Sequence, residues 1–170
     1  FTAAAVLTVV CKYSHPLLPN CDIFVTYVCD EADSVKVTVD YPGAPNQSDL
    51  PAFGLSFLLD ASLKHVDYYG MGPMETYADR CSGAVLGRYH YEVAENMVPY
   101  MKPQECGNRM GVRTLSVTDD AGAGVVVEAM DAPLEISVLP WTAEQIEVAG
   151  HYDELQGSCR TVLDIALKRK

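Results

Sequence analysis

The chain has 170 residues and a formal net charge of -11, with 49% hydrophobic and 21% charged residues. These values are typical of one ordinary globular domain, and a chain of this length can bury about 70% of the surface that its unfolded form exposes. The negative charge argues against nucleic acid and against anionic membranes as partners, because both select a basic face. No segment reaches the roughly 18 consecutive apolar residues of a membrane span.

Alternation of apolar and polar residues predicts short strands along most of the chain. The clearest case is residues 35–40, where valines alternate with polar residues, and residues 24–29 are expected as the hairpin partner, with a turn at 31–34. Residues 41–51 contain three prolines and are expected to form a loop. Further strands are predicted at 54–59, 65–69, 111–118, 124–130, 134–138 and 161–167. Residues 119–124 carry a strong turn signal between two of them.

One short helix is predicted after Trp141. Thr142 is a favourable N-cap residue, and Gln145 three positions later completes a capping box. Trp141 and Ile146 stand at the positions of a hydrophobic staple, and Gly150 is suited to end the helix. Many short strands with turn-rich joints and one small helix predict an all-β fold, an antiparallel β-sandwich.

The region from Tyr69 to Arg113 shows neither a helical nor a strand period, and we expect it to consist of loops. Residues 69–80 read Tyr-Gly-Met-Gly-Pro-Met-Glu-Thr-Tyr-Ala-Asp-Arg, and residues 99–109 read Pro-Tyr-Met-Lys-Pro-Gln-Glu-Cys-Gly-Asn-Arg. These two blocks resemble the C-terminal small-chain domain of the large bacterial β-galactosidases, a glycoside hydrolase family with a retaining mechanism. Cys106 stands where that family usually has asparagine. Flanking segments at 49–55, 134–137, 142–145 and 151–155 follow in the same order.

This resemblance implies a β-sandwich of the galactose mutarotase-like, or supersandwich, type. Residues 1–170 would be a single domain, a fragment truncated at both ends. The catalytic glutamates of the family lie in a separate barrel domain, where the parent enzyme is also expected to hold any divalent metal. We therefore assign no catalytic residue and no cofactor to this chain. The expected partners are the other domains of the parent and, through the complete enzyme, a galactoside substrate; a homo-oligomer is compatible with this assignment.

The charged residues of the two blocks allow two interpretations. The structural one is that carboxylates pair with arginines to hold loops that have few backbone hydrogen bonds of their own. The residues expected to do so are Glu75, Asp79, Arg80 and Arg113. The functional one is that some side chains face the sugar, and for this we single out Glu105, Arg109 and Tyr100.

The four histidines show no ligand spacing, and we predict no metal site. The six cysteines are irregularly spaced and mostly in apolar surroundings, which favours reduced thiols and a cytoplasmic location.

We predict a non-catalytic domain that walls the active site of a β-galactosidase and packs against other domains or subunits. The isolated fragment is expected to be inactive. The alternative is a stand-alone carbohydrate-binding or interaction module, which binding of galactose by the chain alone would favour.

Overall fold

The computed structural model describes residues 6–14, 21–30, 33–43, 50, 52–155, 157 and 159–169. These residues form eleven strands, one α-helix and two short 3-10 helices, and every strand pairing is antiparallel. The predicted all-β class with one short helix is confirmed. No helix in the described part of the chain is long and apolar enough to cross a membrane.

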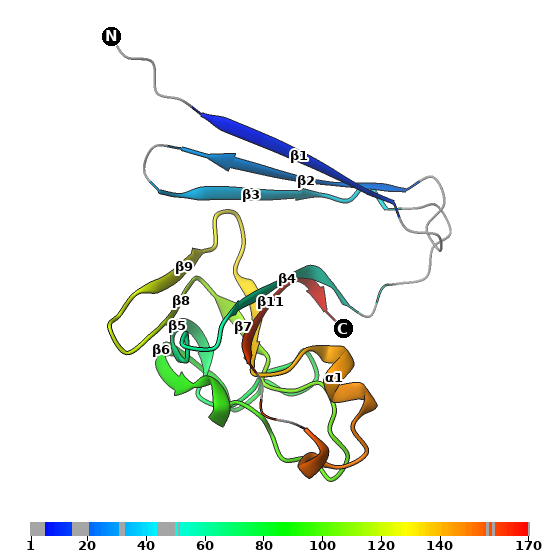
Figure 1. Cartoon of the computed structure of the whole chain (residues 1–170), viewed down its shortest axis with the longest axis vertical. Coiled ribbons are helices and arrows are strands. Elements are labelled where there is room, and N and C mark those ends of the chain that lie inside the picture. Colours follow the sequence, from blue (N-terminus) through cyan, green and yellow to red (C-terminus); the bar gives the residue numbers. More distant parts are fainter. Residues whose placement is uncertain are drawn as a thin grey trace. The chain divides into compact units, whose positions relative to one another are not determined.

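The chain divides into two units, Phe1–Asp49 and Leu50–Lys170. The prediction of one single domain over residues 1–170 stays a prediction. The first unit is a three-stranded meander in the order β1-β2-β3 (Figure 1). Its strands are β1 (Leu7–Ser14), β2 (Asp22–Cys29) and β3 (Val35–Asp40). The predicted turn at 31–34 and the predicted loop at 41–51 lie partly outside the described residues.

The second unit contains two four-stranded sheets, in the orders β4-β11-β10-β7 and β6-β5-β8-β9 (Figure 1). The strands of the first sheet are β4 (Ala52–Asp60), β7 (Arg109–Val112), β10 (Leu134–Leu139) and β11 (Arg160–Arg169). Those of the second are β5 (His65–Gly72), β6 (Val85–Glu92), β8 (Thr114–Thr118) and β9 (Gly124–Glu128).

The main core lies between these two sheets. Val66 and Val117 of one sheet and Ile136 and Val138 of the other have no exposed surface and belong to one apolar cluster. Burial of both inner faces against each other is the defining feature of a β-sandwich. The predicted sandwich is therefore present; its assignment to the mutarotase type stays a prediction.

Two differences from the sequence-based expectation concern the strands themselves. The predicted strand 111–118 is two strands, β7 and β8, in different sheets, and the chain bends between them at Arg113. Gly111 lies within β7, where the register with β10 shifts, and its φ of 65° favours glycine. Strand β6 was not predicted, because Gly87 and several charged residues hide its alternation. Its inward side chains include Tyr89 and Tyr91, which contact the Tyr68 ring.

The helix α1 (Ala143–Val148) begins as predicted. Thr142 is the N-cap, and both hydrogen bonds of the capping box with Gln145 are formed. Ile146 is buried in a second apolar cluster with Met97, Cys106 and Leu139, and Trp141 packs against this cluster. The remaining short helices are η1 (Val93–Glu95) and η2 (Tyr152–Glu154).

Candidate functional site

The two sequence blocks that single out this chain meet at the carboxylate of Glu75. One oxygen, Oε2, accepts a hydrogen bond of 2.7 Å from the backbone N–H of Gly107. The other, Oε1, accepts a bond of 2.7 Å from the Tyr100 hydroxyl and a further bond from Arg80 Nη2. Arg80 also donates to the Tyr100 hydroxyl over 2.9 Å. The Glu75 side chain is only 8% exposed, so this carboxylate connects the first block to both ends of the second.

Backbone pairing of the two blocks continues next to Glu75. The Thr76 N–H donates to the Asn108 carbonyl and the Asn108 Nδ2 donates to the Thr76 carbonyl, each over 2.8 Å. The Thr76 hydroxyl accepts from the Met110 N–H, also over 2.8 Å. Thr76 and Asn108 are both buried. Side-chain amides and hydroxyls here replace the ladder of a sheet, which explains how such irregular segments satisfy their backbone groups.

Gly107 must be a glycine for two reasons. Its φ is 74°, a conformation that side chains disfavour. A Cβ atom at this position would also lie 2.5 Å from Asn96 Nδ2. Asn96 uses that nitrogen to hold the Gly107 carbonyl over 3.1 Å and the Val138 carbonyl of β10 over 3.0 Å. The loop is thereby fixed to the sandwich.

Arg109 is buried, with 6% of its surface exposed. Its Nε donates to the Tyr68 hydroxyl over 3.1 Å, and its Nη1 donates to the Asn108 carbonyl over 3.2 Å. Its guanidinium carbon lies 5.1 Å from the Tyr91 ring centroid and 5.9 Å from that of Tyr68. No carboxylate of the described chain forms an ion pair with Arg109, because its strand position directs the side chain between tyrosine rings.

Burial also changes the acidity of the surrounding groups. It raises the pKa of both Tyr91 and Tyr68, and the Arg109 guanidinium partly opposes this by favouring the phenolate. Both tyrosines are therefore neutral at physiological pH. Burial likewise raises the pKa of the Cys106 thiol, whose Sγ lies 3.3 Å from Met97 Sδ.

The other charged residues of the two blocks lie nearer the surface. Arg113 donates to the Gly111 carbonyl over 2.6 Å and lies 5.6 Å from the Tyr69 ring centroid, so its predicted structural role is not an ion pair. Asp79 is exposed, and no ion pair involves it within the described residues. Glu105 is exposed as well. Of the three residues proposed to face a sugar, Arg109 is buried and Tyr100 is hydrogen-bonded to Glu75 and Arg80; their sugar-facing role stays a prediction.

Glu105 lies at a groove of about 640 Å³ beside α1. The walls are formed by the edge strand β4, by β11 and by the helix, and Trp141, Phe53 and Asp164 also line it. Its volume is in the range of small-ligand sites. Local patterns could not place Glu105 and Trp141 together, since 36 positions separate them.

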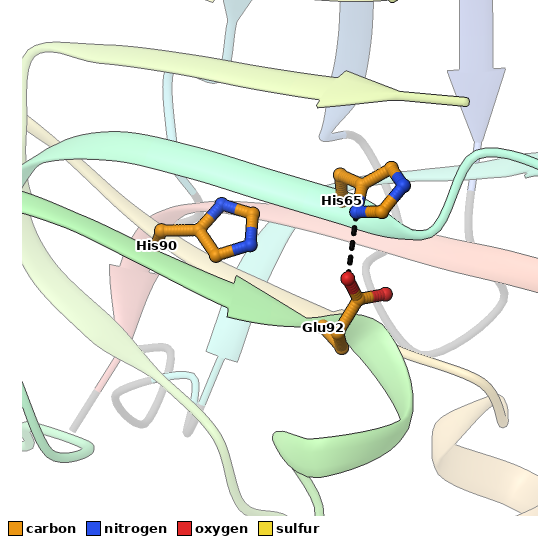
Figure 2. Close-up of side chains that lie close together, drawn as sticks. All are labelled: His65, His90 and Glu92. Atoms are coloured by element: carbon orange, nitrogen blue, oxygen red, sulfur yellow. Dashed lines mark ion pairs between the residues drawn. The ribbon is translucent and has the colours of Figure 1, made fainter. Parts of the chain in front are cut away.

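A second polar group lies on the outer face of the β5–β6 pair and was missed by the sequence analysis. His65, His90 and Glu92 each offer one possible ligand atom, and these atoms lie within 4.8 Å of one another. Figure 2 shows the three side chains on one face, with His65 Nδ1 2.6 Å from Glu92 Oε1. The Asp120 carboxylate, which accepts a hydrogen bond from the imidazole, and then the Glu92 carboxylate raise the pKa of His65.

Comparison with known proteins decides the family. The family described as beta galactosidase small chain matches residues 2–170. This chain belongs to that family. The chain is 43% identical to a β-galactosidase of Lactobacillus delbrueckii subsp. bulgaricus over 143 residues, which is 84% of its own length. It is 38% identical to a β-galactosidase of Streptococcus thermophilus over 155 residues, or 90% of this chain.

The small chain corresponds to a minor part of these relatives, 14% and 15% of their length. A third relative, named beta-galactosidase small subunit, is from Latilactobacillus sakei. It is 31% identical over 169 residues, which cover 94% of this chain and 52% of that protein. The resemblance inferred from the two blocks is confirmed, because the chain belongs to the family whose description is beta galactosidase small chain.

Proposed function

We propose that this small chain is a non-catalytic component of a β-galactosidase that hydrolyses terminal β-D-galactosides. It walls the active site and packs against other domains or subunits of the parent. Support comes from the names of the relatives and from the small share of their length that the chain spans, 14–16% in the first three. Most of such an enzyme, including room for a separate catalytic domain, lies outside the aligned region.

The state of Glu75 supports the non-catalytic assignment. A glycosidase needs two carboxyl groups that face each other across the sugar, one of them free to donate a proton or attack the anomeric carbon. Both oxygens of Glu75 are instead engaged with Gly107, Tyr100 and Arg80. A carboxylate held by three donors in a nearly buried position is a structural anchor, because releasing it would leave the Gly107 N–H without its acceptor.

The exposed apolar side chains beside this anchor support a packing role, and they are the single observation on which the proposed interface rests. Met74 is 72% exposed and Met101 is 93% exposed. They are the sequence neighbours of Glu75 and Tyr100, whose side chains are 2.7 Å apart. Methionine is common at binding surfaces because it is flexible and apolar. We assign this Met74–Met101 surface to contact with the remainder of the enzyme.

Reconstitution tests the proposal. The remainder of the parent enzyme is produced without this chain, the chain is added, and hydrolysis of a chromogenic β-galactoside is followed. We expect no hydrolysis by the chain alone and restoration of activity on mixing. A double change, Met74→Gln with Met101→Gln, should raise the concentration of chain needed for half-restoration by about tenfold or more. Burying one such side chain contributes about 1.5–3 kcal/mol.

The matched control is Met130→Gln, which alters another methionine that is 69% exposed but lies after β9. It should reconstitute like the unmodified chain. Turnover by the purified chain alone, abolished by changing Glu75 or Glu105, would refute the non-catalytic assignment. Binding of galactose to the chain alone, without any effect of the chain on the remainder of the enzyme, would favour the stand-alone carbohydrate-binding module.

A further inference from the structure

The pairing of β5 with β6 places two histidines and two carboxylates in one block. His65 lies opposite Glu92, and Asp67 lies opposite His90. Residues two apart along a strand point to the same face. Val66 and Tyr68, which alternate with His65 and Asp67, are buried in the core, so the four polar side chains project from the outer face of the sheet.

Three of the four side chains converge. The possible ligand atoms of His65, His90 and Glu92 lie within 4.8 Å of one another, and the two imidazole rings are stacked with their centroids 6.1 Å apart (Figure 2). Ligand atoms around a tetrahedral ion with bonds of about 2.1 Å lie about 3.4 Å from each other. The difference between the 4.8 Å limit and this ligand spacing is small for side chains at a solvated surface. The His90 side chain is 52% exposed.

Each imidazole also has a carboxylate behind it. His65 Nε2 lies 2.8 Å from Asp120 Oδ1, and His90 Nδ1 lies 3.1 Å from Asp67 Oδ1. Histidines that bind a metal almost always hold their second nitrogen against such an acceptor, which fixes the tautomer and makes the ligating nitrogen more basic. With those nitrogens occupied, His65 Nδ1 and His90 Nε2 are the atoms available to an ion beside Glu92.

The local charge also favours a cation. Glu92, Asp67 and Asp120 contribute three negative charges around two imidazoles that are neutral when they ligate. Lys64 brings one positive charge to this set, because its Nζ lies 2.9 Å from Asp120 Oδ2. A divalent ion would therefore replace the single His65–Glu92 contact with three metal–ligand bonds and reduce the excess of negative charge.

We propose that His65, His90 and Glu92 bind one divalent transition-metal ion, for which Zn²⁺ is the best chemical match, with Asp67 and Asp120 orienting the two imidazoles. Two imidazole nitrogens and one carboxylate oxygen form a donor set that suits Zn²⁺ and neighbouring first-row ions better than Mg²⁺ or Ca²⁺. Three protein ligands leave a coordination position for water. The site departs from the sequence-based expectation of no metal site, because the strand register joins histidines that are 25 positions apart.

Titration of the intact chain with Zn²⁺ tests this site after accessible thiols have been alkylated, since Cys81 and Cys159 are exposed and would compete. We expect one equivalent to bind, and Co²⁺ in its place to give the visible absorption of a low-coordinate nitrogen and oxygen site. His90→Gln and Glu92→Gln should each weaken binding by at least tenfold. Asp67→Asn should weaken it less than either, since it removes an orienting group and leaves all three ligands in place.

The matched control is His151→Gln, which removes an exposed histidine at the start of η2 and should leave affinity and stoichiometry unchanged. Thermal melts identify any variant that fails to fold. Anomalous diffraction at the zinc edge needs no variant, and a peak between His65, His90 and Glu92 would support the site directly. No binding by the unmodified chain, equal binding by all variants, or a peak elsewhere would overturn the proposal. Because no galactoside is involved, failure here leaves the proposed function unaffected.

Discussion

Loss of the Glu75 carboxylate should destabilise the chain by considerably more than loss of an exposed neighbouring charge such as that of Asp79. Glu75→Ala leaves the Gly107 N–H without its acceptor in a buried loop and removes the acceptor of the Tyr100 hydroxyl. A hydrogen bond to a charged group contributes about 1.5–3 kcal/mol, and a neutral one about 1 kcal/mol. Water can replace part of the Tyr100 interaction, so we expect a loss of about 2–4 kcal/mol in the free energy of unfolding.

Arg80 adds little to this value because its side chain is 56% exposed and the pair is screened by solvent. For a chain of this size, each kcal/mol lowers the melting temperature by about 2–4 °C, so the expected decrease is about 5–15 °C. Urea unfolding followed by circular dichroism gives the free energy directly. Glu75→Gln keeps one acceptor oxygen for Gly107 and should lie between the alanine variant and the unmodified chain.

The control is Asp79→Ala, which removes an exposed carboxylate four positions away and should change the free energy by less than about 0.5 kcal/mol. If Glu75→Ala and Asp79→Ala unfold at the same urea concentration, the Glu75 carboxylate does not hold the two blocks together, and its assignment as a structural anchor is wrong.

Three further outcomes are expected. Arg109→Ala should lower the free energy of unfolding in urea by about 3 kcal/mol or more, because it opens a cavity between tyrosine rings and removes the hydrogen bonds to the Tyr68 hydroxyl and the Asn108 carbonyl. Arg113→Ala, at an exposed site, should lower it by under about 1 kcal/mol, and equal losses would contradict the burial argument. Cys106 is buried and its pKa is raised by burial, whereas Cys81 is exposed. Mass spectrometry should therefore find Cys81 alkylated in the native chain and Cys106 alkylated only after unfolding. Alkylation that requires a reductant would instead reveal disulfides. Burial raises the pKa of Tyr91, so the contribution of this residue to stability is complete below the unfolded pKa of about 10 and decreases as pH rises above it. Absorbance should show the Tyr91 tyrosinate appearing together with unfolding, and tyrosinate from Tyr91 in the folded chain would refute the effect of burial.

Local sequence was sufficient for the features that depend on neighbouring residues. The capping box of Thr142 and Gln145 is formed as predicted, because its atoms are separated by one helical turn. The turn at 119–124 is also present, with the Asp119 side chain accepting from the N–H groups of Ala121 and Ala123. The alternation at 35–40 corresponds to β3. In each case the interaction that stabilises the element is encoded within a few positions.

The sequence blocks identified the family and the pairing of Glu75 with Arg80, but not the surroundings of most of their residues. Both were expected to be loops, and the burial of Thr76, Asn108 and Arg109 was not anticipated. Polarity alone cannot distinguish a solvated charge from one that is enclosed by partners, and the partners here come from segments about 30 positions apart. Strand β6 was missed for a related reason. Its inward residues are glycine and tyrosine, and the ring that Tyr89 and Tyr91 contact is that of Tyr68 in β5.

The amino-acid sequence by itself determined the all-β class, the helix start, the turn at 119–124 and the family, since each depends on local periodicity or on residues at fixed spacing. Only the tertiary structure decided which side chains meet. It engaged Glu75 with Gly107 and Tyr100, and it brought His65 and His90 together. The physical reason is that antiparallel register and loop closure are set by the burial of the whole sandwich core, and distances between remote residues follow from that packing rather than from their separation along the chain.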